Sequence, residues 1–209
     1  MIDKILVIPG YKGSPNGHWQ TWLQTQYPNT ERIKAIDHHK PILSQWSAQI
    51  QQYLEQQTLP IIIIAHSFGC LAALDAIVRK QLQSKVSGVL FVAPASPYRF
   101  TSYGHRADFP NERSIVETLT IRALGVLGTM VVSRNDPWMN YDHACCLASD
   151  LGLLTYDAGY AGHINIESGH GPWPEVKALI DDIQLQVQEM LIHLNNIYLK
   201  LAIRFKFRE

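Results

Sequence analysis

The segment from Pro60 to Cys70, PIIIIAHSFGC, is the feature that most restricts what this chain can fold into. Its four consecutive isoleucines, residues 61–64, are β-branched and apolar on both faces, which indicates a strand buried on both sides of a sheet. Residues 70–80 then have the pattern of an amphipathic helix, and Ser67 and Gly69 occupy the turn between strand and helix. A strand, a tight turn that carries a serine, and a helix form the layout of a nucleophile elbow, which lifts the hydroxyl above the sheet. The segment therefore predicts a reactive serine at position 67.

Composition limits the classes of protein that remain. The chain has 209 residues with 46% hydrophobic content, which suits one domain with a full core. Its 18 basic and 18 acidic side chains balance, which argues against a nucleic-acid or anionic-membrane partner. The three cysteines, two of them adjacent, do not form a disulfide framework and favour a reducing compartment. A short apolar run that ends at Pro9-Gly10 is too short for a signal peptide or a membrane span, so we expect a cytoplasmic protein.

Apolar strands alternate with amphipathic helices along the whole chain. This alternation, with each strand apolar throughout, predicts an α/β fold whose mostly parallel sheet is covered by helices on both faces. No repeat, low-complexity tract or linker divides the sequence. The expected strands are residues 4–8, 33–36, 61–64, 86–93, 128–133 and 153–156, and the expected helices are 18–27, 44–57, 70–80, 141–151 and a long one from Pro174.

Three polar residues follow predicted strands in the order serine, aspartate, histidine. Loops at the carboxyl ends of parallel strands meet at one edge of the sheet, so Ser67, Asp136 and His163 are expected to lie together. A serine hydroxyl needs a base to take its proton, an imidazole with a pKa near ~6.5 can do so, and a buried carboxylate fixes the imidazole. Asp136 could instead be a turn residue before Pro137, and His170 competes as the base, but His163 follows its strand more closely.

An acyl-transfer site also needs donors for the oxyanion of its tetrahedral intermediate. The backbone N–H of Phe68, directly after the serine, is one candidate by its position. The second candidate is the backbone N–H of Tyr11, in the glycine-rich loop after the first strand.

These motifs resemble those of a known family. The chain is similar to the small serine hydrolases of the YdeN and retinoblastoma-binding-protein type, within the α/β-hydrolase superfamily, from about residue 5 to about residue 191. The resemblance implies a compact α/β-hydrolase fold without an inserted lid domain and a catalytic triad of Ser67, Asp136 and His163. Ala65 departs from the pattern, because it replaces the first glycine of the elbow, and the tail after His193 has no counterpart. The segments that carry the resemblance are residues 7–11 with 18–20, 65–70, 93–95, 133–137, 162–165 and 168–175.

The function that these residues predict is hydrolysis of a small ester, thioester or amide through an acyl-Ser67 intermediate. The alternative is a binding or regulatory protein that keeps the hydrolase fold with little turnover, since a fold does not fix a function. A lyase, thiolesterase or perhydrolase that uses the same serine also stays open, and the sequence does not name the substrate. The adjacent His38 and His39 lack further ligands at suitable spacing, so neither a metal nor another cofactor is expected.

Aromatic residues near the predicted site are candidates for the substrate pocket. Tyr98 and Phe100, in the irregular segment 94–113, could wall the pocket or cover the edge of the sheet, and the same holds for Trp138. Asn165, within the Gly-His-x-Asn segment, is a further candidate.

The C-terminus supports two readings. We expect a hydrolase domain over residues 1–193 and an extension over residues 194–209. In residues 197–207 apolar and polar side chains alternate as in a strand, whereas apolar residues from Ile183 to Phe205 also recur at helical spacing. Because an exposed apolar extension needs a partner, it should dock on its own domain or on a second copy, giving a homodimer; a membrane-surface role is less favoured.

Overall fold

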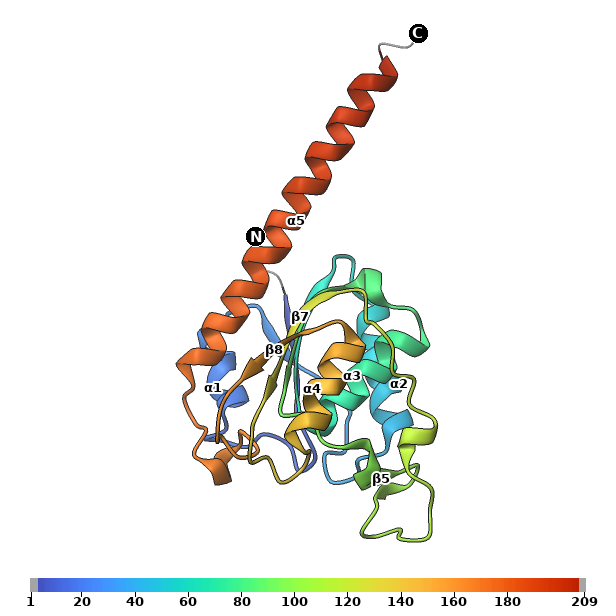
Figure 1. The fold of residues 1–209 in the computed structure, drawn as a ribbon, viewed down its shortest axis with the longest axis vertical. Helices are drawn as coiled ribbons and strands as arrows, with labels where there is room; N and C mark the ends of the chain where they lie inside the picture. Colours follow the sequence, from blue (N-terminus) through green and yellow to red (C-terminus); the bar gives the residue numbers. More distant parts are fainter. Residues whose placement is uncertain (1–3, 207–209) are drawn as a thin grey trace.

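Six parallel strands form one sheet in the order β2-β1-β3-β4-β7-β8, in a computed structural model that describes residues 4–206 (Figure 1). The predicted α/β fold with a parallel sheet is confirmed. The strands are β1 (Ile5–Ile8), β2 (Thr30–Arg32), β3 (Ile61–His66), β4 (Val86–Val92), β7 (Leu127–Val132) and β8 (Leu154–Asp157).

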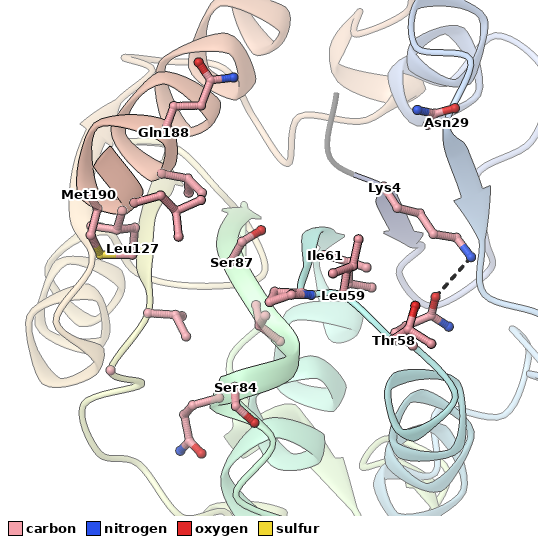
Figure 2. Close-up of a pocket in the computed structure, with 18 of the residues that line it drawn as sticks. Lys4, Asn29, Thr58, Leu59, Ile61, Ser84, Ser87, Leu127, Gln188 and Met190 are labelled. Carbon is pink, nitrogen blue, oxygen red and sulfur yellow. Dashed lines mark hydrogen bonds between the residues drawn. The ribbon is translucent and has the colours of Figure 1, made fainter. Parts of the chain in front are cut away.

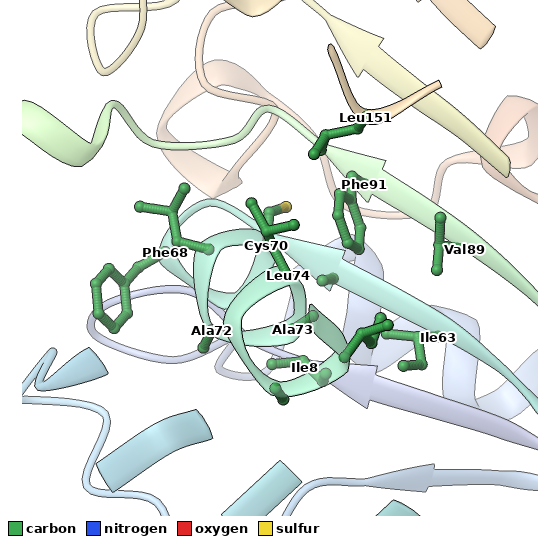
Figure 3. Close-up of a cluster of buried hydrophobic side chains, with 14 of the residues drawn as sticks. Ile8, Ile63, Phe68, Cys70, Ala72, Ala73, Leu74, Val89, Phe91 and Leu151 are labelled. Atoms are coloured by element: carbon green, nitrogen blue, oxygen red, sulfur yellow. The ribbon is translucent and has the colours of Figure 1, made fainter. Parts of the chain in front are cut away.

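Helices cover both faces of this sheet, with α1 and α5 on one side and α2, α3 and α4 on the other (Figure 1). Each face therefore has its own apolar core, and α3 lies at the centre of the larger one (Figure 3). The helices are α1 (Trp19–Gln26), α2 (Leu43–Glu55), α3 (Phe68–Arg79), α4 (Tyr141–Leu151) and α5 (Pro174–Lys206). Short 3₁₀ turns are η1 (Gln83–Lys85), η2 (Pro97–Arg99), η3 (Ile115–Glu117) and η4 (Ile166–Ser168).

The isoleucine run of β3 explains why the sheet is covered twice. Successive side chains of a strand point to opposite faces, so Ile61 and Ile63 enter the core under α2 and α3. Ile62 and Ile64 enter the core under α1 and α5. All four side chains are buried, and a strand with this sequence would be unstable with either face in water.

The order of the strands reverses between β1 and β3. β1 pairs with β2 on one side and with β3 on the other, so the loops after β1 and β3 leave in different directions. Ligands of open parallel sheets bind at such a switch point, beyond the carboxyl ends of the strands. The loops that carry Tyr11 and Ser67 both start here.

The expected strand over residues 33–36 is wrong, because β2 lies three residues earlier. The N–H of Ile33 still donates to the carbonyl of Val7 at 3.0 Å, one residue beyond the end of β2. Ala35 has a φ of +58°, in the left-handed region, so the chain turns away from the sheet there.

The amino end of α3 packs directly on the carboxyl end of β1. A Cβ atom placed on Gly69 would lie 2.4 Å from the carbonyl oxygen of Pro9 and 2.8 Å from that of Ile8. Only glycine allows the two backbones to approach so closely.

We therefore expect Gly69→Ala to destabilise the protein. Alanine is the better helix former by up to about 1 kcal/mol, but the clash with two backbone carbonyls should outweigh this gain and lower the free energy of unfolding by about 1–3 kcal/mol. Chemical denaturation measures the loss. Ala65→Gly, at a buried strand position two residues before Ser67, is the control and should stay within about 1 kcal/mol of the wild type. An unchanged midpoint for Gly69→Ala would contradict the predicted clash.

The longest connection between strands runs from β4 to β7. It contains η2, a small antiparallel hairpin of β5 (Phe100–Thr101) and β6 (Gly104–His105), and η3. This excursion, residues 93–126, is largely irregular and forms no separate domain. The prediction of a fold without an inserted lid domain is confirmed.

The C-terminal segment is helical, not extended. α5 runs without interruption from Pro174 to Lys206, and proline suits the first position of a helix, where its missing N–H is not needed. Ile183 and Val187 pack on the sheet, and Gly88 leaves room for them. Phe207, the last residue of the alternating pattern, lies outside the described residues.

The second half of α5 projects beyond the sheet (Figure 1). Where it leaves the domain, a hollow of about 1330 Å³ opens between this helix and the amino ends of the strands (Figure 2). Met190 and Leu191 of α5 line it on one side, and Leu59 and Lys4 on another. Among residues 4–206, no helix combines the length and the apolarity needed to cross a membrane.

Candidate active site

The structure brings together the three side chains that the sequence predicts as nucleophile, base and acid. The hydroxyl oxygen of Ser67 lies 2.8 Å from Nε2 of His163. Nδ1 of the same imidazole lies 2.9 and 3.0 Å from the two carboxylate oxygens of Asp136. The three residues come from the loops after β3, β7 and β8, and all three side chains are buried.

The backbone of Ser67 is held in an unusual conformation. Its φ of +56° and ψ of −123° lie outside the regions that most residues adopt. The N–H of Ser67 donates to the carbonyl of Val92 at 3.1 Å, which fixes the turn to β4. A Cβ atom on Gly10 would lie 2.7 Å from the Cβ of Ser67, so the loop after β1 has no space for a side chain there. Strain of this kind persists where the surroundings determine the conformation, and here it directs the hydroxyl toward His163.

The carboxylate of Asp136 determines the tautomer of His163. A carboxylate can only accept hydrogen bonds, so Nδ1 of His163 carries the hydrogen and Nε2 presents its lone pair to the hydroxyl of Ser67. The Asp136 carboxylate also accepts from the N–H of Trp138 at 2.8 Å, which holds it in place. The arrangement can move a proton from the serine to the imidazole.

The two predicted oxyanion donors belong to the residue after this serine and to the loop after β1, whose Gly10 packs against the serine. The N–H of Phe68 is the first of α3, where helix N–H groups have no partner within the helix. In the loop after β1, the N–H groups of Lys12 and Gly13 donate to protein carbonyls. Within residues 4–206, the N–H groups of Tyr11 and Phe68 have no such acceptor. Both are free to bind an oxygen of a ligand.

Comparison with known proteins assigns the family. A model described as serine hydrolase matches residues 5–182, a span that contains all the groups above. The chain belongs to the serine hydrolase family. The matched span ends within α5, so the projecting half of that helix lies outside it.

Relatives narrow the serine hydrolase assignment to the YdeN type. A solved YdeN-like protein from Pectobacterium atrosepticum is 32% identical, with a TM-score of 0.73 over 87% of this chain and 91% of that one. YdeN from Bacillus subtilis is 22% identical over 84% of this chain and 93% of its own length. The predicted resemblance to YdeN-like α/β-hydrolases is therefore confirmed, and its retinoblastoma-binding-protein part stays a prediction.

More distant esterases share the fold of this serine hydrolase. The structure of Est1E from Butyrivibrio proteoclasticus with bound ferulic acid superposes with a TM-score of 0.59, over 90% of this chain and 88% of that one. At 12% identity this likeness concerns the arrangement of strands and helices alone.

The four residues predicted to line the substrate pocket of the hydrolase differ from one another in burial and in contacts. Trp138 borders the site, because its ring stacks on His163 with centroids 5.5 Å apart. Phe100 is fully buried, and its ring centroid lies 4.5 Å from that of Phe68, so it packs against the residue that follows Ser67. Tyr98 is 58% exposed. The side chain of Asn165 accepts from the N–H of Ser168 and caps η4, a local role within its own loop.

Two residues near the serine were not predicted as part of the site. The ring of His105 stacks on Tyr11 with centroids 5.9 Å apart, and the guanidinium of Arg99 lies 5.2 Å from the ring of Trp138. Both belong to the irregular excursion, where no periodic pattern indicates the direction of a side chain. Among the described residues, no group of three histidine, cysteine, aspartate or glutamate side chains could hold a metal ion.

His18 is a buried histidine near the base. Burial, together with the charge of Arg32, lowers the pKa of His18 to about 4, so the ring is neutral in the folded hydrolase. Its Nδ1 accepts from the N–H of Gln20 at 3.1 Å and caps α1. Protonation would charge a buried ring and break this cap.

Acidification should therefore destabilise the protein through His18. The folded-state pKa of about 4 lies below the unfolded value near ~6.5. The stabilisation of the folded state by neutral His18 is therefore fully present above about pH 6.5, and it is lost as the pH falls toward 4. The loss from this residue should be about 2–3 kcal/mol between pH 7 and 4.5. Urea unfolding at both pH values, with His18→Asn as a variant that keeps a capping group but does not titrate, measures the difference. Equal pH dependence in both proteins would contradict this assignment.

Proposed function

We propose that this serine hydrolase cleaves a small ester, thioester or amide through a covalent acyl-Ser67 intermediate. The observation that carries the proposal is the unbroken hydrogen-bonded chain from Asp136 through His163 to Ser67, with 2.8 Å between the imidazole and the hydroxyl. Two backbone N–H groups without a protein acceptor in residues 4–206, those of Tyr11 and Phe68, support the proposal as donors for the carbonyl oxygen.

The residues support a two-step reaction. The hydroxyl oxygen of Ser67 attacks the carbonyl carbon while Nε2 of His163 takes the hydroxyl proton, and the carbonyl oxygen becomes an oxyanion between the N–H groups of Tyr11 and Phe68. The imidazolium, stabilised by Asp136, then gives its proton to the departing alcohol, thiol or amine, and the acyl group stays on the serine. A water molecule loses a proton to the same imidazole and attacks the acyl group, which releases the acid and regenerates Ser67.

Fluorophosphonate labelling tests the proposal without knowledge of the substrate. An activated serine should displace fluoride and become covalently modified at Ser67, as intact-protein mass spectrometry and peptide mapping would show. The same preparation should hydrolyse p-nitrophenyl acetate. A folded protein that neither labels nor turns over the ester would favour the binding or regulatory role instead.

The projecting half of α5 is proposed as a self-association surface of this hydrolase. Residues 183, 187, 190, 194 and 197 form one apolar stripe with the alternating spacing of a coiled coil. Its first two members are buried on the sheet, whereas Met190, Leu194 and Ile197 are 42–51% exposed. Since the helix leaves its own domain, the same stripe of a second copy is the surface that we propose covers it.

Shortening this stripe, or placing a charge in it, should reduce the mass of the assembly. We expect sedimentation to give a dimer for the full chain and a monomer for a chain that ends at Asn195. Leu194→Glu in the full chain should also give a monomer, because it places a charge in the apolar stripe. The same oligomeric state for all three proteins would contradict the proposal.

A further inference from the structure

Four side chains bind the backbone of the segment that carries the proposed base. This histidine loop, residues 161–164, has four consecutive residues whose backbone groups bind side chains from elsewhere in the chain. The N–H groups of residues 161 and 162 donate to Ser133 Oγ at 3.1 Å and Asn135 Oδ1 at 2.8 Å. The carbonyl of residue 163 lies 2.9 Å from Nε2 of His66, and the carbonyl of residue 164 accepts from Nε1 of Trp19 at 2.8 Å.

The histidine loop needs these contacts because its backbone is strained. Ile164 has a φ of +48°, in the left-handed region, where a β-branched side chain is unfavourable. The side chain of Ile164 is fully buried, so the surrounding structure enforces this conformation. Such a loop would relax, and move the imidazole, if the groups that hold it were removed.

The tautomer of His66 follows from its partner. The carbonyl of His163 can only accept a hydrogen bond, so Nε2 of His66 carries the hydrogen and donates it. Burial, together with the nearby His163 and His18, lowers the pKa of His66 well below its usual value. The ring is therefore neutral, with one N–H group that points at the backbone of the proposed base.

We propose that His66 and Trp19 are positioning residues: their ring N–H groups hold the carbonyls of residues 163 and 164 and thereby place Nε2 of His163 against Ser67. The inference rests on the proposed function. His66 is the last residue of β3 and directly precedes Ser67, so one short segment both carries the nucleophile and holds the base. Trp19, the first residue of α1, supplies the second contact, and it shares the core under α1 and α5 with Ile164.

Substitutions that remove one N–H at a time test this proposal. Trp19→Phe keeps an aromatic ring and His66→Leu keeps an apolar side chain of similar volume, and each loses its donor. A base displaced by about 1 Å can reduce the rate by about 10²-fold, so we expect kcat per titrated site to fall about 10- to 100-fold with KM little changed. His66→Gln retains an N–H donor and should recover part of the loss. Normalisation to fluorophosphonate-titrated sites removes the contribution of unfolded protein.

Tyr27→Phe is the matched control. It removes a hydrogen bond of 2.6 Å to Asp181, at the end of the same helix and away from the histidine loop. Its kcat per site should equal that of the wild type even where its melting temperature falls. If His66→Leu and Trp19→Phe also lower only the melting temperature, their role is structural and the proposal is overturned.

A second measurement does not depend on turnover. The Nδ1 proton of His163, bonded to Asp136, should give a far-downfield NMR signal in the wild type, identified by its loss in His163→Gln. We expect this signal to shift or broaden in Trp19→Phe and His66→Leu but not in Tyr27→Phe. If the wild type shows the signal but does not hydrolyse the ester, the proposed function is wrong. The comparison of this signal between the variants still tests whether His66 and Trp19 position the imidazole. An identical signal in all three variants would overturn positioning.

Discussion

Ser67→Ala should abolish both ester hydrolysis and fluorophosphonate labelling. The variant has no atom that can form the acyl intermediate, so kcat for p-nitrophenyl acetate should fall by about 10⁴-fold or more. Alanine should also fit the site, since the position is buried and only a hydroxyl is removed. The loss should therefore appear in a folded protein, which circular dichroism and a melting curve would verify.

The control for this variant is Ser47→Ala. Ser47 is equally buried, but it lies on α2, where its hydroxyl accepts from Gln51 at 3.1 Å. Its activity and labelling should match those of the wild type. Label retained at another residue of Ser67→Ala, or turnover within tenfold of the wild type, would exclude Ser67 as the nucleophile.

Asp136→Asn should lower kcat by about 10³- to 10⁴-fold without unfolding the protein. One of the two atoms that face Nδ1 of His163 becomes an NH₂ group, and the remaining oxygen is shared with the N–H of Trp138. The imidazolium that forms during the reaction then loses the charge that stabilises it, and the wrong tautomer becomes available.

The measurement is kcat for the same ester, compared with Asp142→Asn. Asp142 is exposed in the first turn of α4, so the same chemical change there should leave kcat within about twofold. Labelling of Asp136→Asn should be slow but still directed to Ser67. A decrease of less than tenfold would contradict the role of Asp136 as the group that orients the base.

Local sequence patterns were sufficient for the parts of the site that lie on short segments. The isoleucine run, the turn and the helix after it predict β3, Ser67 and α3, since each depends on residues close in the sequence. α3 begins at Phe68, two residues before the expected start, because the turn itself provides the first helical residue. The position of β2 was missed because a left-handed alanine, Ala35, gives no signal in a hydrophobic pattern.

Local sequence patterns do not predict contacts between residues that are far apart in the sequence. His66 binds the backbone of a residue 97 positions later, and Trp19 that of one 145 positions later. In the sequence each has the pattern of an ordinary buried side chain. Only the assembled fold brings its N–H group to the histidine loop. Asn165, a polar residue beside the predicted base, also caps its own turn, a local contact that the sequence analysis did not predict.

The excursion between β4 and β7 borders the site but takes no part in the proposed proton transfer. It supplies none of the groups proposed for proton transfer, and within it Arg99 meets the site through Trp138, whose ring shields His163. Its ends join β4 and β7, and Phe100, Ile115 and Leu119 within it are buried in the core that contains α3, whereas residues 106–113 are exposed. An evolving lineage, or a protein engineer, should therefore be able to change the exposed residues 106–113 while the core and the proposed triad are kept.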